Sequence, residues 1–310
     1  SPADFSLAQL PVDAASEAVK LAEQARMLHE NGNPREAIRV YSRSLDLSPN
    51  EMAYNGRATV FLELRQFREM LADCDRAIAL NPKLGTAYVI RATAHSELGD
   101  VNRAITDCTI AAGLDPTESS AFHVRAMAWF NLGQYELARQ DLDAVIRLAP
   151  DTLVAYQARA VCWTEAQQWE LAVADLTRAL ELKPDWLEGY IVRAKSNVEL
   201  QNFASSLADF ERALRLAPKH VAANNALAFF LATCPNERFR NDDRAIRLAA
   251  TCCELTDWKG YDHIAMLATA YAQAGRFTDA AKWQSQAIRL APQGQAAALT
   301  ERLELYRKGQ

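Results

Sequence analysis

Apolar and polar residues alternate along this chain with the spacing of amphipathic helices. Apolar side chains recur three and four residues apart in segments of roughly a dozen residues, and Gly or polar residues separate neighbouring segments. Many segments end in a similar run, such as Ile146-Arg147-Leu148-Ala149-Pro150, where the proline stops a helix that it cannot continue. The pattern therefore predicts a series of short helices joined by turns.

The prolines that end these segments are regularly spaced. Six of them follow one another at steps of 33, 34, 34, 34 and 34 residues. A further proline, Pro292, lies 74 residues after Pro218, which equals two repeats plus six inserted residues. The spacing predicts eight repeats, each a hairpin of two helices. The six evenly spaced prolines are Pro49, Pro82, Pro116, Pro150, Pro184 and Pro218.

Side-chain size repeats with the same period. With each repeat numbered so that its proline is position 32, position 4 is aromatic in repeats 2 to 6, and position 8 is alanine in all eight. Alanine is also frequent at positions 20 and 27, where small side chains let two helices approach closely. This pattern resembles the tetratricopeptide repeat. The alanines at position 8 are Ala25, Ala58, Ala92, Ala126, Ala160, Ala194, Ala228 and Ala268.

The resemblance covers about residues 16–292 and implies an all-α fold. The expected architecture is a right-handed α-solenoid of about eight helical hairpins, because a single hairpin cannot cover its own apolar face. Residues 1–15 are interpreted as an N-terminal lead segment and residues 294–310 as a C-terminal capping helix. The expected repeats are residues 16–50, 51–84, 85–118, 119–152, 153–186, 187–220, 221–260 and 261–293.

A charge pattern accompanies the repeats. Position 7 is Arg and position 23 is Asp in repeats 2 to 6, whereas repeats 1 and 8 lack both. Because the two charges occur together, we expect a ladder of charge-assisted bonds within or between repeats, with an anion-binding stripe as the alternative. The Arg residues are Arg57, Arg91, Arg125, Arg159 and Arg193, and the Asp residues are Asp73, Asp107, Asp141, Asp175 and Asp209.

Composition and charge narrow the class of partner. Hydrophobic residues make up 50% of the 310 residues, which is enough for a buried core. The net charge is -5, whereas nucleic-acid-binding proteins usually carry a basic patch, so we expect no nucleic-acid partner. No apolar run is long enough to span a bilayer. We expect a monomeric, cytoplasmic chain, with export as the alternative because the sequence begins Ser1-Pro2 without a methionine.

Motifs that support catalysis do not occur in the sequence. The glycines are at least 14 residues apart, so phosphate-cradling and dinucleotide-binding loops are excluded, and esterase, zinc-protease and kinase signatures are missing. The best metal candidates are Cys234, Cys252, Cys253 and His263, but the cysteines fall at opposite ends of two antiparallel helices. We therefore expect no enzyme, no cofactor and no metal site.

The resemblance implies where partners bind. In tetratricopeptide proteins, positions 2, 5, 9 and 12 of each first helix look into a concave groove, and in this chain those positions are mostly apolar and neutral. We expect Met127, Phe130 and Phe229 to anchor a peptide, unless they pack between adjacent helices. The groove residues carried over are Met52, Asn55, Thr59, Leu62, Thr86, Val89, Thr93, Ser120, His123, Met127, Phe130, Val154, Gln157, Val161, Ile191, Lys195, Val198, Asn225 and Phe229.

The seventh repeat has an extended turn that contains Arg238, Phe239 and Arg240. It resembles the final repeats of a group of bacterial tetratricopeptide proteins, some of which append the array to kinases. The turn is either a contact site or a feature of that group's fold.

The resulting functional hypothesis is a non-catalytic scaffold or adaptor that binds peptide segments of partner proteins in its groove. The alternatives are a regulatory array of a larger, kinase-type enzyme, and a binder of a small apolar ligand in the channel of the solenoid.

Overall fold

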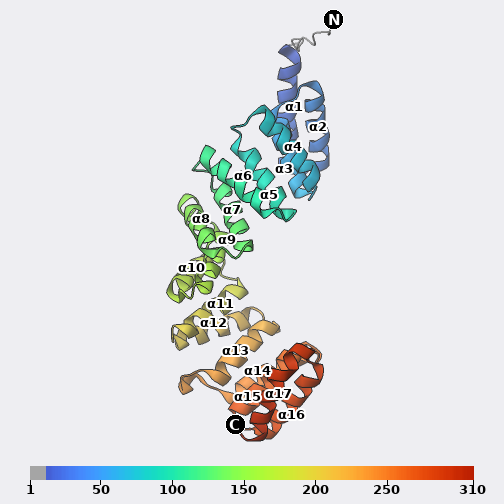
Figure 1. Ribbon diagram of the computed structural model, residues 1–310. Helices are drawn as coiled ribbons and strands as arrows, with labels where there is room; N and C mark the ends of the chain where they lie inside the picture. The colour runs from blue at the N-terminus through green and yellow to red at the C-terminus, as the bar shows by residue number, and fades with distance from the viewer. Residues whose placement is uncertain (1–11) are drawn as a thin grey trace. The chain divides into compact units, whose positions relative to one another are not determined.

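The computed structural model describes residues 12–310, and all regular elements in that range are helices (Figure 1). Contacts between helices divide the chain into two units, Ser1–Ala155 and Tyr156–Gln310. Residues 1–11, most of the expected lead segment, lie outside the described residues. The helices of the first unit are α1 (Val12–Glu30), α2 (Pro34–Leu47), α3 (Glu51–Glu63), α4 (Phe67–Leu80), α5 (Gly85–Glu97), α6 (Val101–Leu114), α7 (Ser119–Asn131) and α8 (Tyr135–Leu148).

Helix α9 (Leu153–Glu165) begins just before the division between the units. A short 3₁₀ turn, η1 (Glu237–Phe239), precedes α14. The remaining helices of the second unit are α10 (Trp169–Leu182), α11 (Leu187–Glu199), α12 (Phe203–Leu216), α13 (Val221–Thr233), α14 (Asp242–Leu255), α15 (Tyr261–Gln273), α16 (Phe277–Leu290) and α17 (Gln293–Arg307).

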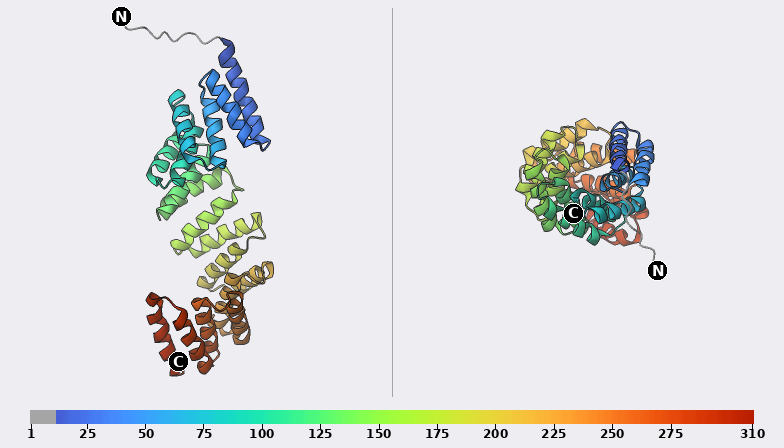
Figure 2. Two further views of the ribbon diagram at one scale, coloured as in Figure 1. Left: turned by 90° about the vertical axis from the view of Figure 1, so that its right-hand side faces the viewer. Right: turned by 90° about the horizontal axis from the view of Figure 1, so that it is seen from above.

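Consecutive helices pair into hairpins in both units. In the first unit α1 packs on α2, α3 on α4, α5 on α6 and α7 on α8, and the second helices α2, α4 and α6 also contact the first helix that follows each of them. In the second unit α11 to α16 form three such hairpins, and α17 packs on α16. The side-by-side stacking can be followed in the views of Figure 2. The predicted all-α solenoid class is confirmed.

Left-handed backbone reverses the chain between the two helices of several hairpins. Gly99 and Gly133 take φ values of 84° and 71° at this turn. Arg65, Gln167 and Gln201 occupy the equivalent place in other hairpins with φ values of 55°, 56° and 59°. This region has a steric cost for residues other than glycine. The hydrogen bonds at the end of the helix offset that cost.

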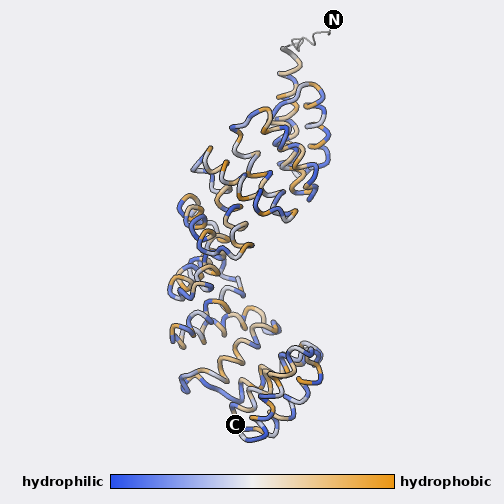
Figure 3. Tube along the Cα trace, viewed as in Figure 1, coloured by the Kyte–Doolittle hydropathy of each residue, from blue (hydrophilic) through white to orange (hydrophobic). Residues whose placement is uncertain are grey.

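The core of each unit is built from small residues on facing helices. All eight position-8 alanines are fully buried. Apolar and polar positions alternate along the individual helices, as the hydropathy colouring of Figure 3 shows. One large core side chain is accommodated by a glycine on the facing helix. Tyr41 of α2 is 2% exposed, and its ring lies directly over Gly56 of α3.

The Arg–Asp ladder predicted from the sequence is confirmed. In all five pairs the guanidinium donates two hydrogen bonds to one carboxylate, from Nε to Oδ2 and from Nη2 to Oδ1, at 2.6–2.8 Å. The Arg side chains are 19–22% exposed and the Asp side chains 6–9%. Each pair joins the two helices of one hairpin, because the partners lie 16 residues apart.

The same arginines also connect neighbouring hairpins. Nη1 of Arg57 donates to Ser42 Oγ at 2.8 Å, and Nη1 of Arg125 donates to Thr109 Oγ1 at 3.1 Å. An aromatic ring one helical turn earlier covers each guanidinium, as Phe122 does for Arg125 at 5.6 Å from the ring centroid. The ladder therefore connects helices both within and between hairpins, and the guanidinium groups of these arginines are used in structural contacts.

Candidate functional site

The first unit has a pocket on the side of its first helices. Its volume is about 580 Å³, and it is lined by residues of α1 and α3 that include the predicted groove residues Met52, Asn55 and Thr59. Tyr41 of the second helix α2 also reaches this pocket, because Gly56 has no side chain to block its ring. The structure thus brings three of the predicted residues together.

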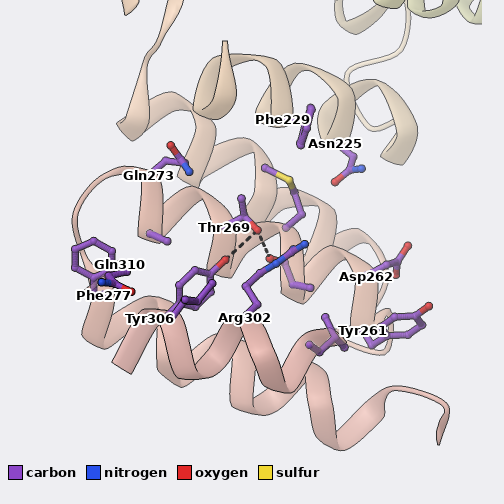
Figure 4. A pocket seen from close by; sticks show the side chains of 15 residues that line it. Asn225, Phe229, Tyr261, Asp262, Thr269, Gln273, Phe277, Arg302, Tyr306 and Gln310 are labelled. Carbon is purple, nitrogen blue, oxygen red and sulfur yellow. Dashed lines mark hydrogen bonds between the residues drawn. The ribbon is translucent and has the colours of Figure 1, made fainter. Parts of the chain in front are cut away.

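The second unit has two pockets that share Asn225 and Phe229 of α13. One, of about 710 Å³, lies between α11 and α13 and includes the predicted residues Ile191 and Lys195. The other, of about 830 Å³, is bounded by α13, α15 and α17 (Figure 4). Phe229 is 55% exposed, so a large apolar ring stands uncovered at the border of both pockets.

Two asparagine side chains in these pockets are unsatisfied. Oδ1 of Asn55 and Oδ1 of Asn225 are buried without a hydrogen-bond partner within residues 12–310. A buried amide oxygen without a partner is destabilising, and a bound ligand that donates an N–H group would satisfy it. Both residues occupy the same position of the repeat, which was assigned to the groove from the sequence.

His123, another predicted groove residue, is also unsatisfied at Nδ1, and burial lowers its pKa. Below pH about 6.5 the unfolded chain therefore binds a proton at His123 more readily than the folded chain does. The contribution of neutral His123 to the free energy of unfolding is present above this pH and is lost as the pH falls. We expect denaturant unfolding to show a loss of stability between pH 7 and pH 5 that is smaller in His123→Phe. An equal loss in both proteins would contradict this expectation.

The other predicted groove residues differ in accessibility. Val89 belongs to a core cluster with Tyr88, and the ring of Phe130 packs edge-on against Tyr135 with centroids 5.4 Å apart. Val198 lines the 710 Å³ pocket. The exposed members are Thr86, Ser120 and Val154, and the partly buried members on their first helices are Leu62, Thr93, Met127, Gln157 and Val161.

The extended turn before α14 packs against α12 and α13 of the second unit. The ring of Phe239 lies 5.9 Å from that of Phe203 and 6.5 Å from that of Phe230. Nε of Arg240 donates to the carbonyl oxygen of Cys234 at 2.7 Å, and Arg238 is exposed. Phe239 and Arg240 therefore have structural contacts, although Arg240 is itself exposed, whereas Arg238 is exposed and its side chain makes no such contact within the described residues.

Several pocket residues were missed from the sequence. Thr269 of α15 and Tyr306 of α17 line the 830 Å³ pocket, with their hydroxyl oxygens 3.4 Å apart. Asp262 and Thr269 occupy groove positions of the eighth repeat, so continuing the positional rule one repeat further would have found them. Arg302 and Tyr306 lie in the helix interpreted only as a cap, where no repeat position identifies them.

The cysteines considered as metal ligands are buried thiols. Burial raises the pKa of Cys252 to about 11 and that of Cys253 to about 12. Over residues 12–310, no three or more His, Cys, Asp or Glu side chains are grouped so that they could hold a metal ion. In the same range, no helix combines the length and apolar character needed to cross a membrane.

The sequence profile of the tetratricopeptide repeat matches residues 22–84, 89–152, 123–185, 191–232 and 265–295. These ranges cover well over half of the chain, and they coincide with the stacked hairpins described above. The chain belongs to the tetratricopeptide repeat family. Repeats of this family form protein–protein interaction modules, and this is the functional class of the chain.

Solved structures of similar fold include the C-terminal part of a repeat protein from Cytophaga hutchinsonii, which is 20% identical, with a TM-score of 0.64 over 79% of this chain and 99% of that one. Pseudomonas aeruginosa pilF is 13% identical, with a TM-score of 0.60 over 67% of this chain and 96% of that one. YrrB, described as having an unusual peptide-binding site, is 16% identical, with a TM-score of 0.54 over 60% of this chain and 96% of that one. At these identities the likeness concerns the fold alone.

Curated relatives match over short segments. Mouse sperm-associated antigen 1 is 38% identical over 52 residues, which is 17% of this chain and 6% of that protein. A 58 kDa phosphoprotein of Plasmodium berghei is 32% identical over 83 residues, which is 26% of this chain and 20% of that protein. The chain thus spans a small part of the length of these relatives.

Proposed function

We propose that this chain is a non-catalytic scaffold that binds peptide segments of partner proteins on the first-helix surfaces of its units. The observation that carries the proposal is Phe229, a large apolar side chain that is 55% exposed at the border of two pockets. Uncovered aromatic residues beside pockets are typical anchors of protein interfaces. The peptide-binding site described for YrrB, which shares the fold, supports the same interpretation.

Capture of partner proteins from a native lysate tests this proposal. The full chain, Phe229→Asp and the control Leu171→Asp are compared, because Leu171 is similarly exposed at 45% but lies on the second helix α10, away from both pockets. We expect Phe229→Asp to lose specific partners that Leu171→Asp retains. Retention of every partner by a folded Phe229→Asp protein would refute the proposed surface.

A second candidate function is the binding of a small apolar ligand, which the 710 Å³ pocket between α11 and α13 favours. Its volume falls within the range of small-molecule sites, roughly 300–1,000 Å³, and its lining includes Ile191, Phe210 and Phe230. Native mass spectrometry distinguishes the candidates, because a tightly held ligand adds a discrete mass that is lost on denaturation.

A further inference from the structure

The 830 Å³ pocket at the C-terminal end of the second unit has three different walls (Figure 4). Phe229 and Asn225 point into it from α13. Thr269 of α15 lies at its floor, Met266 of the same helix also lines the pocket, and Arg302 projects into it from α17. The last helix therefore contributes a wall of a binding pocket in addition to covering α16.

Arg302 is the positively charged residue of this wall. Arg302 is exposed, and within residues 12–310 no Asp or Glu oxygen lies within 4.0 Å of its guanidinium, although the side chain borders an apolar floor. Arg307, on the same helix, pairs with Glu304 at 2.7 Å and does not line the pocket. Asp262 lies at the edge of the pocket near the start of α15, and its Oδ2 is 3.6 Å from His263 Nδ1.

The apolar residues that line the pocket with Arg302 favour the binding of a carboxylate to its guanidinium. A carboxylate seated beside Arg302 would be partly shielded from water by Met266 and Phe229, which strengthens a charge-assisted hydrogen bond. On the facing wall, Oδ1 of Asn225 is buried, has no hydrogen-bond partner among the described residues, and can accept an N–H group. A peptide segment supplies both an N–H donor and side chains to either side of its backbone.

We infer that this pocket recognises a peptide that carries a large apolar side chain close to a carboxylate. The apolar side chain occupies the floor beside Phe229, the carboxylate pairs with Arg302, and the peptide backbone donates to Asn225. The carboxylate comes from an acidic side chain or from the C-terminus of the partner. This inference rests on the proposed function and specifies the partner that the second unit selects.

The test uses the full chain and four pools of short peptides that carry a neutral dye, with Ala, Ser, Gln and Gly at the unspecified positions. The first pool has Leu followed two residues later by Glu and a blocked C-terminus, and the second has Gln in place of that Glu. The third pool ends in Leu with a free carboxylate, and the fourth ends in amidated Leu. Dissociation constants are measured by fluorescence anisotropy.

We expect at least one carboxylate pool to bind about tenfold or more tightly than its neutral counterpart. Preference for the first pool identifies an acidic side chain, and preference for the third identifies a terminal carboxylate. Arg302→Gln should reduce the preference to less than about twofold, whereas the matched control Arg307→Gln should keep it. Both positions are exposed on α17, so neither change removes buried packing.

Two outcomes overturn the inference while leaving the proposed function in place. One is equal binding of all four pools that is abolished by Phe229→Asp. The other is a carboxylate preference that survives Arg302→Gln. If no pool binds and Phe229→Asp also retains every captured partner, the proposed function fails together with the inference.

Discussion

Replacing Asp141 with alanine is expected to lower the free energy of unfolding by about 3 kcal/mol. Asp141 accepts two hydrogen bonds from Arg125, and its own side chain is 8% exposed. The hydrogen bonds to Asp141 raise the pKa of Arg125, and burial lowers it. Arginine is protonated at neutral pH even without a partner, so the charge remains when Asp141 is removed. The cost arises because a mostly buried guanidinium is left without a carboxylate. It falls at the low end for buried pairs because part of Arg125 reaches water.

The control is an ion pair on the surface that is joined by one hydrogen bond. Arg65 and Glu97 lie 2.9 Å apart, but their side chains are 73% and 42% exposed. Glu97→Ala should cost less than about 1 kcal/mol because water replaces the lost partner. Both variants are measured by urea unfolding followed by helical circular dichroism, with a nearest-neighbour analysis suited to repeat proteins. Equal effects of the two substitutions would show that the ladder contributes no more than surface pairs.

Replacing Gly56 with alanine is expected to destabilise the first unit by about 1–3 kcal/mol. A Cβ at this position would lie 2.4 Å from Tyr41 Oη and 2.5 Å from its Cζ. The Tyr41 ring is 2% exposed, so accommodating the Cβ requires displacing a buried ring that packs between α2 and α3. The added methyl group therefore forces overpacking instead of filling free space.

The same substitution elsewhere should have the opposite sign. Gly113, also helical, has no heavy atom within 4 Å of the place where a Cβ would lie, so Gly113→Ala should stabilise by roughly 0.5–1 kcal/mol. Tyr41→Leu should rescue Gly56→Ala, since a smaller side chain leaves room for the methyl group. Cys74 and Ile90 occupy the positions of Tyr41 and Gly56 one repeat later, where the small residue is on the second helix and the larger one is on the following first helix. Failure of this rescue in thermal unfolding would place the defect outside the Tyr41–Gly56 contact.

The repeat pattern predicted the parts of the molecule that recur. The spacing of the prolines and alanines indicated the hairpins, and the joint occurrence of Arg125 with Asp141 indicated the ladder. These features are readable because local periodicity sets helix faces and the same contact is formed in each repeat. The positions assigned to the groove likewise placed Asn225 and Phe229 on the helix that borders two pockets.

Features that occur once were not readable in this way. Phe239 packs against Phe203 although the two are 36 residues apart, and no periodicity relates them. Val89 and Phe229 both fall on positions assigned to the groove, yet one is in a core cluster and the other is exposed, because burial depends on the size of the neighbouring helix's side chains.

The amino-acid sequence alone determined the family, the helical hairpins and the pairing of charges, since all three follow from contacts between residues at fixed separations along the chain. The pockets required the folded coordinates. Asn225 and Arg302 face one cavity from helices that are not consecutive, and which side chains remain unpaired there depends on how α13, α15 and α17 pack together. Such packing combines many weak contacts between distant residues, and no single position in the sequence encodes it.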